Sequence, residues 1–309
     1  MHKILIFLLL FCSVLDAQML TRTRVMMGTF VTVSLQESRY FNDVFKVLND
    51  VDNSLSSYKK DALVYRLNHK RRVFLDANLY EALVLSREFY KRSDAYFDIA
   101  IGSITKDLYH FGEDERVAKS SELKESNISI NGVHFNHKIA YLDDNIKLDF
   151  GGMGKGFAVD KASIFLKKMG VKKGIIAVSG DIRCLDICKI NINNPFSDNS
   201  LASFETKKRD MGISTSGNYN RYVKSTKNNH LINPKQKKPE QNFVSITLIG
   251  DIPSSYLDAY ATSASVMSKK KAYKFLNSLR VGYIVLEDNK RLVVSSNIKR
   301  YVNKLIINY

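Results

Sequence analysis

The sequence predicts an α+β protein in which mixed sheets pack against helices. Alternating apolar and polar residues predict short strands, and apolar residues at helical spacing predict amphipathic helices between them. The strands and helices do not alternate strictly, as they would in a parallel α/β fold, and no internal repeat is visible. The 309 residues, 45% of them hydrophobic, allow one large domain or two ordinary ones.

The predicted elements follow one another along the whole chain. Strand patterns cover 30–35, 174–178 and 243–248, a further strand ends at 146–150, and two or three strands end the chain. Helical periodicity covers 41–55, 79–93, 158–169, 257–267 and 271–279. Two polar segments are expected outside these elements: 113–127 on the surface and 193–209 as a mobile loop.

The formal charge of +16 raises the question of a nucleic-acid partner. The lysines, however, occur in short scattered pairs and triples, such as 172–173 and 269–271. Aromatic residues are not interleaved with them, as a stacking platform would require. We therefore expect no nucleic-acid partner. A lysine-rich solvated surface explains the charge, with attraction to anionic ligands or lipid head groups as the second explanation.

The N-terminus predicts export. His2 and Lys3 precede an apolar run over 4–15, too short to span a membrane comfortably, so residues 1–18 are interpreted as a signal peptide. Simple cleavage near Gln18 would leave a periplasmic protein. Cleavage before Cys12 would instead give a lipoprotein anchored to the inner membrane, but Phe11 is a poor residue to precede a lipid-bearing cysteine, so simple cleavage is favoured.

Cys184 and Cys188 are the cysteines that remain in the body of the chain. An oxidising compartment permits a disulfide between them. In a continuous strand, however, residues four apart are separated by about 13 Å, so a bond would require a turn or a bulge. No histidine is close in sequence, which argues against zinc. We expect two buried free thiols.

Residues 149–160 are the segment around which the sequence is organised. Four glycines lie there between the predicted strand and helix; Asp149 precedes them and Lys155 lies among them. Glycines let a backbone approach a ligand closely, and the first N–H groups of a helix can bind phosphate. Lys155 would add a positive charge beside a pyrophosphate. The pattern is neither GxGxxG nor a Walker loop, and an ordinary glycine turn is the alternative.

Two further groups have the chemistry of a site. Asp258 and Thr262 lie four residues apart on one predicted helix face, where two oxygen donors suit a hard cation such as Mg²⁺. The alternative is that Asp258 caps its own helix while Thr262 bonds back along it. His230, beside Asn233 and Pro234, is either a turn residue or a general base. No Gly-x-Ser-x-Gly motif supports a serine hydrolase.

Seven short motifs, taken in order, resemble the ApbE family of FAD:protein FMN transferases from about Met26 to the C-terminus. They are Met27-Gly28-Thr29, Tyr96-Phe97-Asp98, Asp149-x-Gly-Gly-x-x-Lys155-Gly, Ser179-Gly180-Asp181, Ser214-Thr-Ser-Gly-x-Tyr-x-Arg221, His230-x-x-Asn-Pro234 and Asp258-x-x-Ala-Thr262. Two positions depart from the family pattern: Ser179 replaces the usual glycine, and Tyr96 stands where alanine is common.

The resemblance implies a T-fold-related α+β structure in which residues 22–309 form a single compact catalytic unit. It also implies the site. The expected Mg²⁺ ligands are the side chains of Asp258 and Thr262 and the carbonyl groups of Gly152 and Ala261. The expected flavin and adenosine contacts are Met27, Tyr58, Tyr96, Phe97, Asp98, Asp149, Lys155 and Ile232. Catalysis is assigned to Lys155 and to His230, a candidate base whose unperturbed pKa would be near 6.5.

The activity implied by the resemblance is Mg²⁺-dependent cleavage of FAD, the substrate, with transfer of FMN to a threonine hydroxyl and release of AMP. The partners would be exported or membrane electron-transfer subunits that become flavinylated. Two alternatives remain. The same site could use water as the acceptor and act as an FAD pyrophosphatase, or the protein could be a non-catalytic FAD-binding lipoprotein. The paired Asp258 and Thr262 argue against the last, because storing FAD needs no hard-metal site.

Overall fold

The computed structural model describes residues 18–308. Apart from Gln18, the predicted signal segment with Cys12 lies outside the described residues. Within them, no helix combines the length and the apolar character needed to cross a bilayer.

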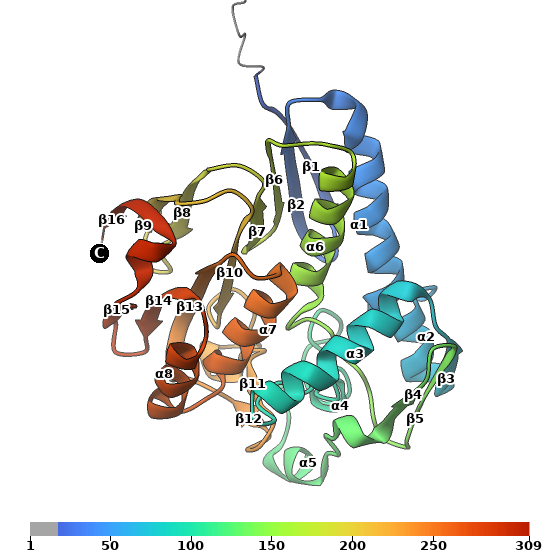
Figure 1. Cartoon of the computed structure of the whole chain (residues 1–309). Coiled ribbons are helices and arrows are strands. Elements are labelled where there is room, and N and C mark those ends of the chain that lie inside the picture. The colour runs from blue at the N-terminus through green and yellow to red at the C-terminus, as the bar shows by residue number, and fades with distance from the viewer. Residues whose placement is uncertain (1–17, 309) are drawn as a thin grey trace, which may run out of the picture.

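An eight-stranded antiparallel sheet forms the centre of the molecule (Figure 1), in the order β1-β2-β6-β7-β10-β13-β14-β15. Its strands are β1 (Leu20–Met26), β2 (Thr29–Leu35), β6 (Gly174–Val178), β7 (Asp181–Cys184), β10 (Met211–Gly217), β13 (Phe243–Gly250), β14 (Gly282–Glu287) and β15 (Leu292–Val294). Because strands from both ends of the sequence share this one sheet, the prediction of a single α+β unit is confirmed.

Helices α1 (Phe41–Leu55), α6 (Gly154–Lys168) and α7 (Ser254–Ser265) cover one face of this sheet (Figure 1). The apolar residues of α1 that the helical spacing singles out, Val44, Phe45, Leu48 and Val51, are all buried in the main core. Strands β2 and β6 contribute Val33 and Ile176 to the same core. The remaining helices are α2 (Leu63–Lys70), α3 (Ala77–Arg92), α4 (Gly102–Thr105), α5 (Ser120–Glu125) and α8 (Lys269–Ser278), with short 3₁₀ helices at Ser38–Tyr40, Ile130–Gly132, Thr226–Asn228 and Ile298–Arg300.

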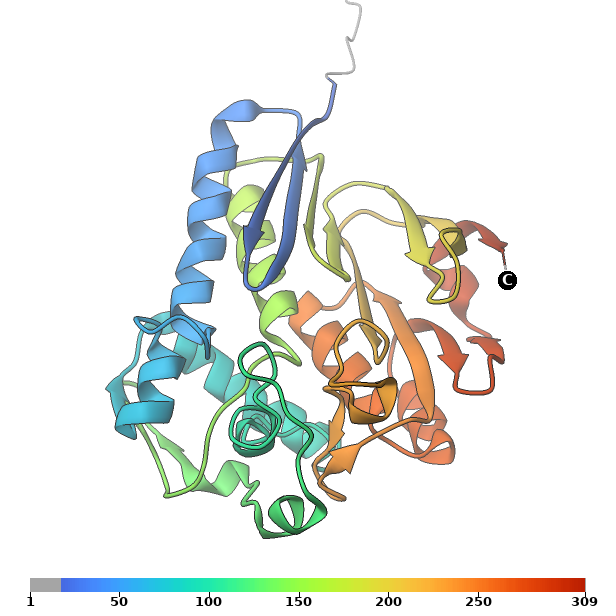
Figure 2. The same cartoon turned by 180° about the vertical axis from the view of Figure 1, so that it is seen from behind.

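Three smaller sheets surround the central one. A sheet in the order β16-β9-β8 packs on the opposite face of its β7–β14 half and closes a second core (Figure 2). Its strands are β8 (Lys189–Asn193), β9 (Ser200–Thr206) and β16 (Val302–Ile307). The other two sheets are β3 (Arg72–Phe74), β5 (Ile139–Leu142) and β4 (Val133–Phe135), and the pair β11 (Ile232–Asn233) and β12 (Lys238–Pro239).

Two of the expectations about secondary structure are wrong. Segment 193–209 is not a mobile loop, because β9 buries Leu201 and Phe204 in the second core. Segment 146–150 is not a regular strand, although Leu148 and its alternating apolar neighbours are buried. The N–H and carbonyl groups of Leu148 are hydrogen-bonded by the side chain of Asn68, at 2.7 and 2.9 Å, instead of by a neighbouring strand.

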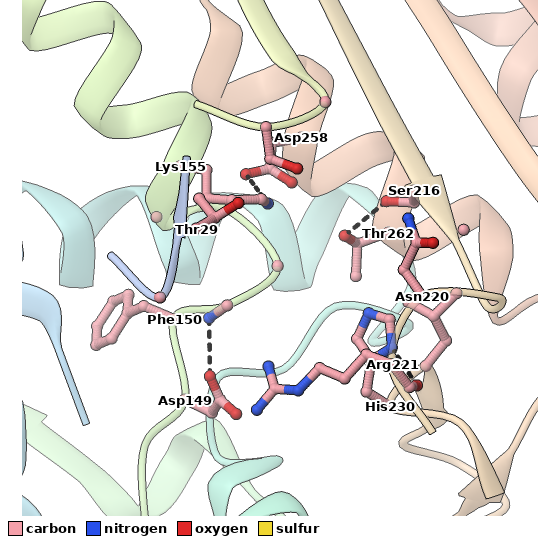
Figure 3. A pocket seen from close by; sticks show the side chains of 18 of the residues that line it. Thr29, Asp149, Phe150, Lys155, Ser216, Asn220, Arg221, His230, Asp258 and Thr262 are labelled. Carbon is pink, nitrogen blue, oxygen red and sulfur yellow. Dashed lines mark hydrogen bonds and ion pairs between the residues drawn. The ribbon is translucent and has the colours of Figure 1, made fainter. Parts of the chain in front are cut away.

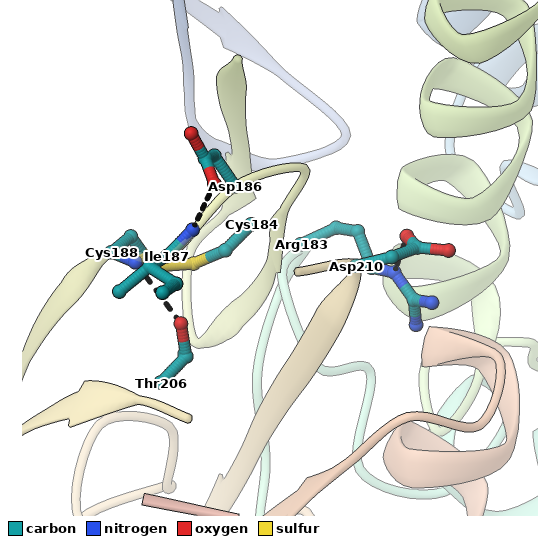
Figure 4. Close-up of a disulfide and its surroundings, with 7 residues drawn as sticks. All are labelled: Arg183, Cys184, Asp186, Ile187, Cys188, Thr206 and Asp210. Carbon is teal, nitrogen blue, oxygen red and sulfur yellow. Dashed lines mark hydrogen bonds and ion pairs between the residues drawn. A yellow bond between two sulfur atoms is a disulfide. The ribbon is translucent and has the colours of Figure 1, made fainter. Parts of the chain in front are cut away.

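The expectation of two free thiols is also wrong: Cys184 and Cys188 form a disulfide (Figure 4). Strand β7 ends at Cys184, and the chain turns before β8 begins at Lys189. The turn brings the two Cα atoms to 6.0 Å, within disulfide reach. A continuous strand would hold the two cysteines too far apart, but this segment contains the required turn.

This disulfide should contribute to stability. By the loop-closure argument, a crosslink that closes so short a loop is worth about 2 kcal/mol. Replacing both cysteines with serine should therefore lower the free energy of unfolding by about 2 kcal/mol, measured by urea denaturation under non-reducing conditions. Reduction of the wild type should give the same loss. A double variant that is as stable as the oxidised wild type would contradict this expectation.

Candidate functional site

A cavity of about 960 Å³ opens beside the β1–β2 turn, the β6–β7 turn and the first turn of α6. Every residue predicted for the site lines it except Ala261: Met27, Tyr58, Tyr96, Phe97, Asp98, Asp149, Gly152, Lys155, His230, Ile232, Asp258 and Thr262. Ala261 is fully buried within α7, and its carbonyl oxygen accepts a hydrogen bond from the Ser265 hydroxyl at 2.8 Å. Segments separated by more than 200 residues therefore meet at one site.

Helices α6 and α7 cap each other at this cavity. The Asp258 carboxylate, from the second turn of α7, accepts the N–H of Gly156 in the first turn of α6 at 3.0 Å. In return, the Asp160 carboxylate on α6 accepts the N–H groups of Ser254 and Ser255 at the start of α7, at 2.7 and 2.9 Å. Carboxylates at helix N-termini satisfy free N–H groups and the helix dipole. The alternative that Asp258 caps its own helix is wrong, because α7 begins at Ser254.

The glycines of 149–160 permit this contact, and two of them belong to the helix. Helix α6 begins at Gly154, four residues before the predicted start, so Lys155 and Gly156 lie in its first turn. A Cβ atom on Gly156 would lie 2.3 Å from the carbonyl oxygen of Ser254. One on Gly152 would lie 2.9 Å from the Thr262 methyl carbon. The glycines therefore bring the backbone against α7.

Lys155 lies between two buried carboxylates. Its Nζ is 2.9 Å from Asp181 and 3.4 Å from Asp258, and 28% of its side chain is exposed. Figure 3 shows Lys155 beside Asp258. Burial would lower the pKa of Lys155, but the two carboxylates raise it above its usual range. Burial and the nearby Asp181 raise the pKa of Asp258 to about 7, against the opposing effect of Lys155. This end of the cavity holds one more carboxylate than ammonium.

Asp149 lies at the second end of the cavity, which is more positively charged. Its carboxylate accepts hydrogen bonds from Thr105 Oγ1 at 2.7 Å and from the N–H of Gly151 at 2.8 Å. Lys106 Nζ is 3.7 Å away, and the Arg221 side chain extends toward Asp149 (Figure 3). Burial would raise the pKa of Asp149, but Lys106 and Arg221, with the two hydrogen bonds, hold it below its usual range.

Arg221 and Lys106 also fix the ring of Tyr58. Lys106 Nζ lies 3.5 Å from the ring centroid, and the Arg221 guanidinium donates to the tyrosine hydroxyl. That hydroxyl donates in turn to the Phe111 carbonyl at 2.7 Å. A ring held by two cations and a hydrogen bond forms a pre-oriented aromatic wall of the cavity.

His230 is held in one tautomer. Its Nδ1 is 3.1 Å from the carbonyl oxygen of Arg221, which only accepts, so Nδ1 carries the proton and Nε2 keeps a free lone pair. Burial and the charge of Arg221 lower the pKa of His230 to about 4. The expected pKa near 6.5 is thereby corrected, and the imidazole is neutral at physiological pH.

Two turns at the cavity contain non-glycine residues in the left-handed region. Met27 and Gly28 both have positive φ, as a type I′ turn between β1 and β2 requires. Ser179, in the β6–β7 turn, has φ 54°. This conformation favours glycine, which gives a physical reason for the glycine common there in the family that the sequence resembles.

Tyr96, Phe97 and Asp98 lie in the loop after α3. Lys235 and Lys271 approach the Tyr96 ring, at 4.6 and 4.8 Å. Asp98 is buried, and its carboxylate accepts the N–H groups of Ala100 and Ile130. Burial raises the pKa of Asp98 to about 6, against the effect of those two hydrogen bonds.

Comparison with known proteins gives the family. The model of the ApbE family matches residues 27–286. The FAD:protein FMN transferase of Buchnera aphidicola is 24% identical over 80% of this chain and 79% of its own, and that of Vibrio cholerae is 22% identical over 85% and 84%. This chain belongs to the ApbE family.

The fold agrees with solved structures of the same family. The ApbE protein of Thermotoga maritima superposes with a TM-score of 0.84 at 19% identity, over 93% of this chain and all of the other. The flavin transferase ApbE of Vibrio cholerae gives 0.79 at 18% identity, over 92% and 99%. The predicted ApbE-like architecture is therefore confirmed.

Asp181, Arg221 and Lys106 belong to the site of this ApbE protein, although the sequence did not single them out. Asp181 and Arg221 stand within two of the family motifs, but a place in a motif gives neither residue a role of its own. Asp181 is fully buried between Lys155 and the Ser214 hydroxyl, which donates to it. Its signal in the sequence was a carboxylate after a Ser-Gly turn. Arg221 gave no stronger signal than its place in the motif.

The donors present fit a hard cation. The described residues contain no group of three or more His, Cys, Asp or Glu side chains able to hold a metal, so hydroxyl and carbonyl oxygens would have to contribute. The Asp258 carboxylate, the Thr262 hydroxyl and the backbone of Gly152 supply oxygen donors of that kind. The Asp181 carboxylate, which contacts Lys155 Nζ at 2.9 Å and accepts the Ser214 hydroxyl, is a further oxygen donor next to them.

The titration of His230 can be measured directly. Its NMR resonances should report a neutral Nδ1–H imidazole with a midpoint near pH 4. The unfolded chain protonates histidine near pH 6.5, so between about 6.5 and 4 the unfolded state binds more protons. The stability contribution of His230 is therefore complete above pH 6.5 and is lost as the pH falls toward 4. A His230→Gln variant should lack this loss, and a midpoint at 6.5 or above would contradict the assignment.

Proposed function

We propose that this chain is an FAD:protein FMN transferase, acting on a threonine hydroxyl of an exported or membrane acceptor protein and releasing AMP. The observation that carries the proposal is the partly buried, neutral His230, whose Nε2 lone pair belongs to the cavity that Lys155, Asp149 and Asp258 also line. A neutral imidazole can accept a proton at physiological pH, whereas a threonine hydroxyl barely ionises there.

The transfer step forms one phosphorus–oxygen bond and breaks another. The threonine oxygen forms a bond to the phosphorus on the FMN side of the pyrophosphate, and the bond from that phosphorus to the bridging oxygen breaks. AMP leaves with the bridging oxygen. The proton of the hydroxyl moves to His230 Nε2, while the Nδ1 proton stays hydrogen-bonded to the Arg221 carbonyl oxygen.

The residues around the phosphates would offset their charge. Lys155 and Arg221 are positive groups at the cavity, and the Tyr58 ring gives a flat surface for an aromatic ring of FAD. Mg²⁺, if held by Asp258, Thr262 and the carbonyl of Gly152, would neutralise phosphate charge as phosphoryl transfer requires.

We further propose that the protein acts in the periplasm, with an inner-membrane lipid anchor at Cys12 as the alternative to simple cleavage. The Cys184–Cys188 disulfide supports an oxidising compartment. The acceptors would be electron-transfer subunits.

Substitutions can distinguish the proposed metal-binding role of Asp258 from its role as a cap of α6. Asp258→Ala should abolish transfer while part of the FAD binding survives, because the aromatic and backbone contacts remain. Asp258→Asn keeps an oxygen for the Gly156 N–H but loses the negative charge, and it should also be inactive. The control is Asp160→Asn, which weakens the equivalent cap on α7 without changing a cavity donor. It should keep most activity at a cost of about 1 kcal/mol of stability. Full activity in Asp258→Ala, measured by mass spectrometry of the acceptor, would refute the assignment.

His230 distinguishes a transferase from a hydrolase. His230→Ala should slow FMN transfer by about 10²- to 10⁴-fold, the usual worth of a general base, without loss of metal-binding groups. The rate should be measured per folded molecule, together with FMN release in the absence of acceptor. A wild-type rate in the folded variant would leave His230 as a turn residue. Equal FMN release with and without acceptor would favour the FAD pyrophosphatase.

A further inference from the structure

Strand β1 is a free edge of the central sheet. It stands first in the strand order and pairs with β2, and among residues 18–308 no strand pairs with its other side. Six of its seven residues are exposed, and only Met26 is partly buried. A row of backbone hydrogen-bonding groups therefore remains available along β1.

The register identifies those groups. A two-residue turn makes Met26 and Thr29 a hydrogen-bonded pair, and such pairs alternate along an antiparallel ladder. Arg24 and Arg22 accordingly bond to β2. The N–H and carbonyl groups of the residues between them point away from β2, toward the open side; these residues are Thr21, Thr23 and Val25.

This edge has only part of the usual protection against pairing. Natural edge strands are blocked by proline, by charged side chains, especially lysine, or by a covering element. Strand β1 contains neither proline nor lysine. Its two charged side chains fold back over α1, where Arg22 lies 4.6 Å from the Phe41 ring and Arg24 lies 4.2 Å from the Phe45 ring. The edge itself stays open.

The edge ends at the cavity. Met27, Gly28 and Thr29, the turn that follows β1, line it. Val25 and Phe30, on either side of the turn, face each other across the two strands with 75% and 69% of their surface exposed. Exposed apolar side chains beside a cavity mouth are typical of a surface that binds a partner.

We propose that the acceptor protein docks by adding an extended segment to the open edge of β1. This proposal rests on the proposed function, which requires a protein hydroxyl to enter the cavity. Backbone hydrogen bonds to Thr21, Thr23 and Val25 would supply affinity, as in other cases of strand addition. The hydroxyl residue lies at the end of the segment that reaches the turn.

The two faces of β1 give the chemistry of the acceptor segment. Side chains of an added strand alternate between faces. One face would meet Thr21, Thr23 and the exposed pair Val25 and Phe30, so it fits small residues and one apolar side chain near the hydroxyl. The other face would meet Arg22 and Arg24, so it fits acidic residues. The net charge of +16 favours the same acidic segment.

Substitutions along β1 test the docking. The probes are nine-residue synthetic peptides, each with one threonine flanked by acidic, basic, apolar or polar residues. Attachment of FMN to each peptide is measured by mass spectrometry. Val25→Pro and Thr23→Pro remove outward N–H groups and leave the bonds to β2 intact. They should raise KM for the best peptide about tenfold or more, and Phe30→Ser should raise it several-fold. Phe74→Ser, at an aromatic residue that is 78% exposed on β3, is the matched control and should change nothing.

FAD affinity and melting temperature are measured on every variant. A variant that still binds FAD and takes the peptide with wild-type KM would overturn the docking proposal and leave the transferase assignment intact. If the wild type flavinylates no peptide or protein and only releases FMN, both proposals fall.

Amide hydrogen exchange gives a second, independent test without any substitution. The wild type with FAD is saturated with the best peptide after its threonine is replaced by valine, which cannot react. Exchange at the amides of Thr21, Thr23 and Val25 should slow at least tenfold, whereas Arg22 and Arg24, already bonded to β2, should not change. No protection in β1 would overturn the proposal. The proposal would also be overturned if the protein forms a dimer in solution that the Val25→Pro substitution dissociates. The edge of β1 would then bind a second copy of this chain.

Discussion

The site depends on the reciprocal capping of α6 and α7. Each helix gives a carboxylate to the N-terminus of the other, Asp160 to α7 and Asp258 to α6. Only glycine at 156 lets the two first turns approach this closely, since a Cβ would meet the Ser254 carbonyl oxygen. The contact fixes Lys155 beside Asp258. One interaction thus joins two segments about 100 residues apart and orients the groups that the chemistry uses.

The capping also explains the division of charge in the cavity. The Asp258 carboxylate is buried because it caps the N-terminus of α6. Lys155 is the one cation that contacts it, and Lys155 also contacts Asp181. The opposite end has Lys106 and Arg221 against Asp149 alone. One end therefore has two carboxyl groups for a single ammonium group, a set of oxygen donors that suits a cation, and the other end has an excess positive charge that suits phosphate. Desolvation, and after it the charge of Arg221, lower the pKa of His230 and keep the imidazole neutral, so the positive end contains an unprotonated base.

The sequence predicted most of the fold, and all of its predicted site residues except Ala261 line one cavity, for identifiable reasons. Helix 41–55 and strand 174–178 were predicted at their observed bounds, because their apolar spacing matches the face they bury. Segment 146–150 shows the limit of such patterns. Alternation reports burial, but it does not reveal that the side chain of Asn68 replaces a neighbouring strand. The disulfide was not predicted for a related reason, since no glycine or proline marks the turn between Cys184 and Cys188.

The sequence was least informative where a residue acts through a distant partner. The spacing of Asp258 suggested a cap on its own helix, and only the folded chain shows that it caps α6. The β6–β7 turn shows the same dependence. Ser179 keeps a positive φ because its N–H donates to the Phe30 carbonyl at 3.1 Å, which fixes this turn to the strand that follows the β1–β2 turn. The left-handed residues at both turns are thus held by a single strand pair, β2 with β6. The conformational cost of about 1 kcal/mol or more for each is offset by the packing of the central sheet. Strain at the mouth of the cavity is therefore supported by the most regular part of the fold.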